Sequence, residues 1–548
     1  MHIVWFKRDL RLPEHAPLRA AAARGPVLPL YVVEPDLWRE ADASFRHWWF
    51  IRDCLLDLDT ALRQLGGTLI VRHGEITAVL ADLAREHGVF ALWSHEETGN
   101  GWTFARDRRV AAWCREHGIP WQELPTNGVI RRLKDRDGWA SRRNAVMSAP
   151  QLLPPPRIRF ACARSEPLPA RDDALFRTGH DAIADGSPPA GDGPPPGDGP
   201  PERGGPPDGG GPTASVQSGG RVEALRVLGS FLDSRSSRYM RTISRPGVSA
   251  RHCSRLSAHL AWGTLSVREV DQAAAARINE LSQSPDPGSA DWARQLQAFR
   301  SRLAWRCHFV QKLEQQPSLE FRCMHPAFEG MREESFNAAF FDAWRHGRTG
   351  YPLVDACMRS LQANGWITFR MRAMLVAFAS YHLWLDWRRT APVLARLFTD
   401  YEPGIHFSQF QMQSGVTGIN AVRIYNPVKQ SLEHDPEGKF IRRYVPELRE
   451  VPIEAIHEPW RLDAPPRGYP APIVDHEAAA REARRRMTPY WRGEDFREQA
   501  REVFRRLGSR NRPRETPRKK RRSAPPAAAV APQVQFDFGF TDNSPPDT

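Results

Sequence analysis

The stretch YPLVDACMRSLQANGWITFRMRAMLVAFASYHLWLDWR, residues 351–388, decides how the second half of this chain folds. Apolar residues recur in it at helical spacing, which predicts two amphipathic helices joined at the Gly-Trp pair of residues 365–366. Arg370 and Arg372 interrupt this stripe, and a buried guanidinium needs an anionic partner. A core hairpin with surface arginines would explain the spacing, but the density of tryptophan, tyrosine and arginine exceeds what a core needs. The apolar stripe consists of Met371, Leu375, Phe378 and Leu383.

Two kinds of pattern divide the chain. Residues 1–135 alternate amphipathic stretches, such as residues 45–65, with the short apolar runs HIVWF, PVLPLYVV, GTLIVRH, ALWSHE and WQELP. This alternation predicts a doubly wound α/β domain with a parallel sheet. Residues 221–492 show helical periodicity without strand patterns, and they predict an all-helical second domain. Its expected helix ends lie at Gly263, Pro317, Pro326, Pro352 and Gly365.

The segments outside these domains are rich in proline. Residues 136–220 form the predicted connector, and from about residue 164 they include GDGPPPGDGPPERGGPPDGGG, a composition that favours disorder. Residues 493–548 form a predicted basic, partly disordered tail that contains RPRETPRKKRR and, near its end, QVQFDFGF. The latter faintly resembles a clamp-binding peptide, although a solvated extension is the simpler interpretation.

Composition limits the class of protein. The formal charge is +13, with 77 Lys plus Arg against 64 Asp plus Glu, which indicates a polyanionic partner. The sequence has no apolar run of membrane-spanning length and no signal peptide at MHIVWFKRDLRL, so we expect a cytoplasmic protein without a membrane span. The seven cysteines are scattered without a C-x-x-C pair, which argues against a disulfide framework, an iron-sulfur cluster or another metal site. We expect them to be reduced thiols in the cores.

Many motifs in one order resemble the photolyase and cryptochrome family. The first is WFKRDLRL at residues 5–12, and the later ones are SRLS, AWGTLSVRE, GRTGYPLVDACMR, GW, DWR, RIYNPVKQ, DPEGKFIRRYVPEL and HEPW. The resemblance covers about residues 1–460. It implies an α/β antenna domain followed by a helical FAD-binding domain, with FAD as cofactor and DNA containing pyrimidine dimers as partner. We expect a monomer.

The resemblance also implies which residues bind FAD. Residues 254–257 would hold its pyrophosphate, although from pattern alone they are equally an ordinary polar helix start. Arg372 and Asp400 match the arginine and aspartate beside the isoalloxazine ring, where the guanidinium would stabilise the anionic reduced flavin. His406 falls where photolyases usually place an asparagine facing the ring, and a histidine there would change the protonation of the flavin. The implied cofactor-binding residues are Tyr239, Ser254, Arg255, Leu256, Ser257, Arg372, Asp400 and His406.

The implied lesion pocket matches the family only in part. Trp305 and Arg370 match a pocket tryptophan and its neighbouring arginine, and Met412 stands in place of a second tryptophan. These three are the predicted catalytic residues. Arg302 replaces a glutamate that hydrogen-bonds the thymines in repair enzymes. Phe369 and Ala373 replace an asparagine and a methionine.

The light-driven electron path departs from the family as well. Of the three tryptophans that relay electrons to the flavin, the inner and outer positions hold Phe410 and Glu334, and only the middle one, Trp387, remains. Trp387 and Trp384 are the predicted electron-transfer residues. Other aromatic candidates are Trp344, Trp366 and Tyr381. In the first domain Thr103 replaces a folate-binding glutamate, which disfavours methenyltetrahydrofolate and leaves open another antenna or none.

Three classes of function follow from these features. The first is a blue-light DNA repair enzyme that splits cyclobutane pyrimidine dimers by electron transfer from excited, reduced FAD. The alternative is a cryptochrome-type photoreceptor with little or no repair activity, which Arg302, Phe369 and Met412 favour. Trp305, Arg370 and the basic charge favour DNA contact. The third class, a light-independent DNA-binding flavoprotein, would bind FAD but show no response to illumination.

Overall fold

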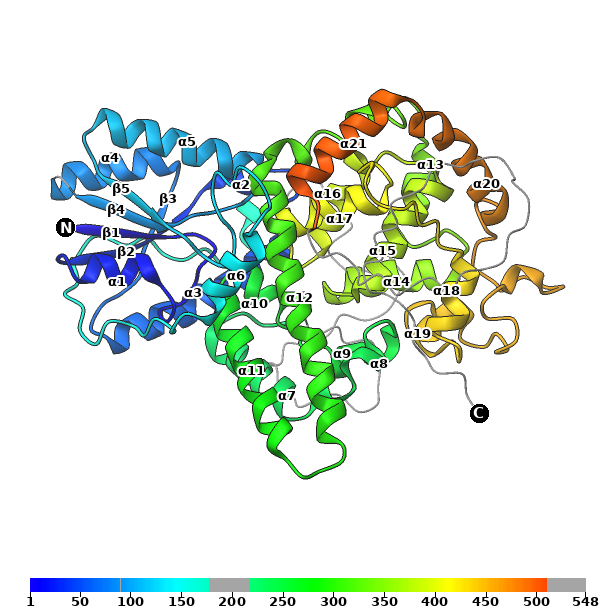
Figure 1. The fold of residues 1–548 in the computed structure, drawn as a ribbon, viewed down its shortest axis with the longest axis horizontal. Helices are drawn as coiled ribbons and strands as arrows, with labels where there is room; N and C mark the ends of the chain where they lie inside the picture. The colour runs from blue at the N-terminus through cyan, green and yellow to red at the C-terminus, as the bar shows by residue number, and fades with distance from the viewer. Residues whose placement is uncertain (89, 177–215, 510–548) are drawn as a thin grey trace.

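The computed structural model describes residues 1–88, 90–176 and 216–509, and it has a sheet domain at one end and a helical domain at the other (Figure 1). The sheet has five parallel strands in the order β3-β2-β1-β4-β5. All five predicted strands are confirmed. Their bounds are β1 His2–Phe6, β2 Val27–Val33, β3 Ile70–His73, β4 Ala91–His95 and β5 Trp121–Leu124.

Helices cover both faces of this sheet (Figure 1). The predicted helix at residues 45–65 is confirmed as α3. The remaining helices of this half are short or amphipathic, and the last one, α6, lies in the predicted connector. The bounds are α1 Ala16–Ala22, α2 Pro35–Trp38, α3 Phe45–Gln64, α4 Ile76–His87, α5 Gly101–Glu116 and α6 Trp139–Ser148.

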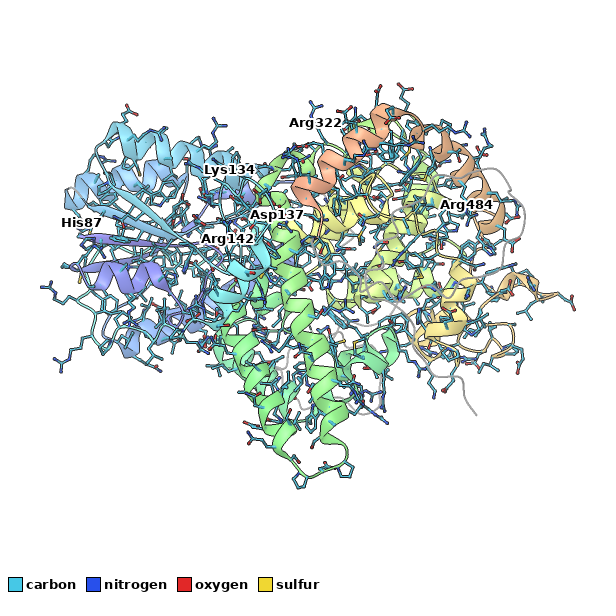
Figure 2. The ribbon with its side chains drawn as sticks, in the orientation of Figure 1. His87, Lys134, Asp137, Arg142, Arg322 and Arg484 are labelled. Carbon is cyan, nitrogen blue, oxygen red and sulfur yellow. The ribbon has the colours of Figure 1, made fainter. Side chains whose placement is uncertain are left out.

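The second half is helical, as predicted. The long helix α12 lies near the middle of the molecule, between the sheet domain and the helices α14, α15 and α18 to α20 (Figure 1). Figure 2 labels His87, at the end of α4 in the sheet domain, and Arg484, on α20 in the helical domain. The helices are α7 Arg221–Asp233, α8 Tyr239–Thr242, α9 Pro246–His252, α10 Ser257–Ala261, α11 Val267–Gln283, α12 Ser289–Gln315, α13 Ala338–Arg345, α14 Pro352–Asn364, α15 Phe369–Ala377, α16 Trp387–Leu397, α17 Pro403–Gln413, α18 Pro427–His434, α19 Lys439–Tyr444, α20 His476–Met487 and α21 Glu494–Leu507.

The stretch that opened the sequence analysis forms α14, α15 and a following π-helical turn, Phe378–His382. Its predicted apolar stripe is buried, with no member more than 2% exposed. Gly365 ends α14 in the left-handed conformation at φ 69°, where a Cβ would lie 2.2 Å from Thr399 Oγ1. Glycine is therefore required there for two reasons, its backbone conformation and the close contact. The contact places the loop that carries Asp400 beside α15.

Three sequence expectations need correction. The helical domain does not end at residue 492, because α21 follows and buries Val503 and Leu507 against the end of α12. Residues 164–176, expected to be disordered, pack on the sheet domain, where Phe176 stacks on Trp48 with ring centroids 4.2 Å apart. Cys162 is exposed, whereas the other six cysteines are buried. The Gly/Pro-rich repeats of residues 191–211 and the tail beyond residue 509 lie outside the described residues.

The two domains are joined through the loop after β1. Arg8 donates to the main-chain oxygens of Ala261 at 3.1 Å and Tyr401 at 2.5 Å, and it stacks 4.2 Å from the centroid of the Trp262 ring. Arg11 donates to Gly263 O at 2.9 Å. Within the described residues, none of the helices is both long and apolar enough to cross a membrane.

Candidate functional site

A cavity of about 310 Å³ lies in the helical domain between α8, α10, α12, α15 and α17. This volume is at the lower end of the roughly 300–1,000 Å³ typical of ligand sites. Seven of the eight predicted cofactor-binding residues and all three predicted catalytic residues line it. Leu256 is the exception, because its side chain is fully buried in the hydrophobic core beside the cavity. The predicted site residues that line it are Tyr239, Ser254, Arg255, Ser257, Arg372, Asp400, His406, Trp305, Arg370 and Met412.

Arg372 and Asp400 form the predicted bidentate pair. The guanidinium nitrogens lie 3.0 and 2.8 Å from the two carboxylate oxygens, and Arg372 Nε also donates to Ile367 O at 3.0 Å. Burial of Asp400 opposes its charge. The pKa of Asp400 nevertheless lies below its ordinary value, because the stabilisation of its charge outweighs the effect of burial. That stabilisation comes from Arg372, the Ser257 hydroxyl and Arg255. The carboxylate is therefore ionised at neutral pH, and it fixes the guanidinium in the cavity wall.

The segment at residues 254–257 differs from an ordinary helix start. The N-cap position of α10 falls on Leu256, which has no side-chain cap, so the interpretation of its serines as N-caps is wrong. Ser254 Oγ instead accepts from Leu256 N at 3.4 Å. Arg255 has a positive φ of 59°, rare for a residue with a side chain, and its guanidinium lies 4.2 Å from the centroid of the Trp366 ring. This backbone conformation presents Arg255 to the cavity.

The charges of the cavity suit a polyanion. Five arginines line it against two carboxylates, and the second carboxylate, Glu402, pairs with Arg306 at 2.6 Å. Three positive charges thus remain in excess, which matches a pyrophosphate together with an anionic flavin ring. Gln409 also lines the cavity, and neither amide atom of its side chain has a hydrogen-bond partner among the described residues. A buried amide of this kind would be satisfied by the donors and acceptors of a flavin, so the residues fit FAD.

His406 is held in one tautomer. Its Nε2 lies 2.9 Å from Ala391 O, and because a carbonyl oxygen only accepts, Nε2 carries the proton. Burial lowers the pKa of His406 to about 3. The imidazole is therefore neutral, and its Nδ1 is an acceptor, in contrast to the amide of an asparagine, which offers both a donor and an acceptor.

Comparison with known proteins identifies the fold family. Residues 2–134 match the DNA photolyase model, and residues 299–489 match the model for the FAD binding domain of DNA photolyase. A deoxyribodipyrimidine photo-lyase from Thermus thermophilus is 30% identical over 453 residues, which span 81% of this chain and 92% of that relative. The chain belongs to the photolyase and cryptochrome family. Its helical domain is accordingly an FAD-binding domain.

Solved structures of the family share this fold. A bacterial class III photolyase from Agrobacterium tumefaciens superposes with a TM-score of 0.72 at 24% identity, covering 89% of this chain and 97% of its own. A cryptochrome from Synechocystis sp. PCC6803 also gives 0.72, at 22% identity, covering 88% and 98%. The fold is therefore common to a protein named photolyase and one named cryptochrome, and it does not separate the two.

Residues that depart from the family pattern line the same cavity as those that match it. Arg302, Phe369 and Ala373 line the cavity together with Trp305, Arg370 and Met412. Arg302 makes a side-chain hydrogen bond with Tyr239, and burial raises the pKa of that tyrosine. Because the tyrosine is neutral, the guanidinium donates to its hydroxyl. A cation thus stands in the cavity wall beside Tyr239.

Most predicted electron-transfer residues lie away from the cavity wall. Trp387 and Trp384 do not line the cavity, nor do Trp344 and Tyr381, whereas Phe410 and Trp366 do. Trp384 lies between two cations, with Arg332 4.5 Å and Arg486 5.2 Å from its ring. Such neighbours disfavour a positive charge on the indole. Glu334 is exposed.

Two residues of the site were missed by sequence reasoning. Gln409 could have been found, because it follows His406 by three positions on the same face of α17. Tyr401 could not. It lines this cavity and also a second, smaller cavity in the sheet domain, and its hydroxyl donates to Asp42, a residue 359 positions away in the sequence.

The second cavity measures about 70 Å³, well below the roughly 300 Å³ of a small ligand site. Thr103 lines it, at the predicted antenna position. Buried ion pairs fill much of this edge of the sheet: Arg106 contacts Glu34 at 3.1 Å and Glu97 at 2.6 Å. A chromophore of flavin or folate size has no room between these side chains. The identity of an antenna stays open.

One group among the described residues brings three potential metal ligands together, namely Asp9, His15 and His95. Asp9 Oδ2 lies 2.9 Å from His15 Nε2 and 2.7 Å from His95 Nδ1. These separations are those of hydrogen bonds rather than of atoms that share one ion. The expectation of no metal site stays a prediction.

Proposed function

We propose that this protein is a deoxyribodipyrimidine photolyase, a light-driven enzyme that splits cyclobutane pyrimidine dimers in DNA. The observation that carries the proposal is that the predicted cofactor-binding and lesion-binding side chains line one continuous cavity. The relative from Thermus thermophilus bears this name, and its likeness extends over nearly its whole length. The basic charge of the chain suits a DNA partner.

In this proposal the chain holds FAD in the cavity and brings the dimer to it. Reduced FAD, when bound, supplies under blue light the electron that opens the cyclobutane ring. Ser254, Arg255 and Ser257 bind the pyrophosphate, and Arg372 stabilises the negative charge of the reduced ring. The remaining steps belong to the side chains that receive the DNA.

A dimer inside a duplex must leave the base stack to reach the cofactor. Trp305, which is half-buried on α12, offers a face for the flipped bases, and Met412 offers a polarizable apolar contact. Arg370 binds the DNA phosphate or the lesion edge. Arg302 donates hydrogen bonds to the thymine carbonyls, where a glutamate would accept one from the ring nitrogen.

The second candidate function is a cryptochrome-type photoreceptor. Arg302 favours it, because this cation hydrogen-bonds Tyr239 and cannot accept a hydrogen bond from the thymines, as the glutamate of repair enzymes does. In this case light changes the FAD and a partner surface, and no dimer is opened.

The deciding experiment uses an oligonucleotide with one cyclobutane thymine dimer, illuminated with blue light without oxygen, with the FAD reduced chemically beforehand. Prior reduction removes any dependence on the altered electron path. Light-dependent recovery of intact thymines supports the photolyase. Bound, reduced and photoactive FAD without recovery contradicts it and favours the photoreceptor, and FAD that does not respond to light favours the light-independent flavoprotein.

Further parts of the proposal concern the rest of the protein. We propose a cytoplasmic monomer divided into domains at residues 1–135 and 221–507, with residues 136–220 as connector. The segment QVQFDFGF, which lies outside the described residues, would make a weak clamp-type contact. Deletion of residues 510–548 with unchanged clamp binding would contradict that contact.

A further inference from the structure

Tyr401 occupies a position between the two cavities. It lines both of them and is only 5% exposed. Its ring stacks on His47 at a centroid distance of 5.6 Å and 13°, and it meets His406 edge-on at 5.2 Å. The tyrosine therefore connects the wall of the FAD cavity to the sheet domain.

The hydroxyl of Tyr401 has a buried base. It donates to Asp42 Oδ2, and the Asp42 carboxylate also accepts from Asn100 Nδ2 at 3.0 and 3.2 Å. Asp42 is 7% exposed. The neighbouring Glu320 has a pKa raised to about 8, by burial first and by the charge of Asp42 second. Glu320 is thus mostly protonated at neutral pH.

Three other tyrosine and tryptophan side chains line the FAD cavity, and the contacts described for them differ from those of Tyr401. Trp366 carries the Arg255 guanidinium 4.2 Å from its ring centroid, which disfavours an indole cation. The Tyr239 hydroxyl is bonded to Arg302, and a guanidinium cannot take up a proton. Trp305 packs its ring on His308 and Phe309, 5.5 and 5.6 Å away. Arg8 binds the main-chain oxygen of Tyr401, so a cation is close there too, but the Tyr401 hydroxyl also contacts the Asp42 carboxylate.

We propose that Tyr401 is the electron donor that reduces oxidised FAD under blue light, with Asp42 as the acceptor of its proton. One electron passes from the phenol to the light-excited, oxidised flavin. The phenolic O–H bond breaks, and the proton moves to Asp42 Oδ2. The products are a neutral tyrosyl radical, a protonated Asp42 and a flavin reduced by one electron, so the total charge is unchanged. A thiolate from solution then gives one electron to Tyr401 and becomes a thiyl radical, and Asp42 returns the proton.

This route explains how a chain with Phe410 at the inner relay position would still reduce its flavin. Transfer of the proton to a carboxylate already in hydrogen-bond contact avoids a charged tyrosine radical cation in a buried site. The inference rests on FAD in the cavity and not on DNA repair.

The test uses the full-length holoprotein with oxidised FAD, without oxygen and with dithiothreitol as the thiol. Samples are frozen after blue light and examined by electron paramagnetic resonance, in protein made with ordinary or ring-deuterated tyrosine. The rate of flavin reduction is followed by absorbance. The variants are Tyr401→Phe and Asp42→Asn, and Tyr381→Phe is the matched control. Tyr381 is buried, its hydroxyl has no hydrogen-bond partner among the described residues, and it lines neither cavity.

We expect a radical whose hyperfine splitting changes with deuterated tyrosine in the unaltered protein and in Tyr381→Phe. In Tyr401→Phe this signal should be lost and flavin reduction slowed at least about tenfold, with FAD still bound. Asp42→Asn should slow the reduction as well. A tyrosyl signal that persists in Tyr401→Phe, a tryptophan radical in its place, or no light-driven reduction in the unaltered protein would overturn the inference.

A second measurement needs no variant, and so it holds even if a substitution releases FAD. Flavin reduction in the unaltered protein should be slower in heavy water than in ordinary water, because the phenolic proton moves with the electron. Equal rates would contradict the role of Asp42. DNA is absent from both experiments, so failed repair with chemically reduced FAD and failed radical formation are separate results.

Discussion

The two walls of the FAD cavity differ in how far they keep the family pattern. The cofactor wall, defined as Ser254, Arg255, Ser257, Arg372 and Asp400, matches it and contains its own bidentate ion pair. The substrate wall, defined as Arg302, Trp305, Arg370 and Met412, keeps two residues and changes two. Under the proposed function, binding of the cofactor depends on an ion pair between distant segments of the chain. Under the same proposal, selection of the substrate depends on single side chains, which can change without unfolding the protein.

The largest effect is expected from Asp400→Asn, which removes the anion from the cofactor wall. Arg372 and Arg255 would then face each other without a carboxylate, and loss of one member of such a pair costs about 3–5 kcal/mol. We expect loss of bound FAD and a lower urea midpoint. Flavin absorbance per chain and denaturant unfolding measure the two quantities.

The control for this change is Asp342→Asn. Asp342 pairs with Arg345 at 2.7 Å, but its side chain is 54% exposed, and such pairs contribute about 0–1 kcal/mol. Full FAD content in Asp400→Asn would contradict the dependence of the cofactor wall on its ion pair.

A second prediction concerns the turn that supports the cofactor wall. Gly365→Ala brings a methyl group within 2.2 Å of Thr399 Oγ1 and shifts the loop that carries Asp400. Gly330→Ala is the matched control, because Gly330 has a similar φ of 80° but no atom near its Cβ position. We expect Gly365→Ala to be less stable than Gly330→Ala by about 1–3 kcal/mol and to retain less FAD. Equal unfolding free energies would show that backbone conformation alone matters at Gly365.

For the substrate wall, Trp305→Ala should abolish the preference for dimer-containing DNA while FAD stays bound. Stacking of a base on an aromatic side chain contributes about 1–3 kcal/mol, so the affinity for damaged DNA should fall toward that for intact DNA. Binding to matched damaged and intact oligonucleotides measures the difference. Trp113→Ala on α5, outside the cavity lining, should leave it unchanged. Loss of FAD from Trp305→Ala would place this residue in the cofactor wall instead.

The smallest effect concerns His406, which lies between the walls. Its folded pKa of about 3 is below the ordinary 6.5, so the unfolded chain binds the proton first and stability falls as the pH drops below 6.5. When the pH is lowered from about 7 to 5.5, this residue should reduce the free energy of unfolding by about 1 kcal/mol. His406→Asn should remove that part of the slope, while His346→Asn, at an exposed position, should not. The same variant should alter the lifetime or protonation of the flavin radical, and an unchanged radical would place His406 away from the ring.

Local patterns predicted most of the fold. Strands β1 to β4 and helix α3 follow from periodicity, because each buries an apolar run or face, whereas β5 at the edge of the sheet is only partly buried. Helix α21 was missed although its signal was present: Phe496, Val503 and Leu507 recur at helical spacing after an acidic first turn. It was assigned to the tail because the segment that follows it is strongly basic. Residues 164–176 were missed because the contact of Phe176 with Trp48 is not a local one.

The candidate site was predicted through resemblance rather than periodicity. The resemblance placed Arg372 opposite Asp400, and the structure confirms their pairing. It could not indicate Tyr401, because the importance of this residue comes from Asp42 in the other domain. Likewise, only the structure shows that Arg302 hydrogen-bonds Tyr239. Contacts between distant segments depend on the packing of whole domains, which no spacing in the sequence encodes.

The close approach of the two domains at Gly263 limits how the protein can be recombined. Gly263 has a φ of 75°, and a Cβ there would lie 2.2 Å from Arg8 O, in the same loop that holds the main chain of Tyr401. The sheet domain is thus a structural part of the flavin site and not an exchangeable module. A chimera that takes residues 1–135 from a relative should keep its flavin only where the grafted loop fits against glycine at position 263.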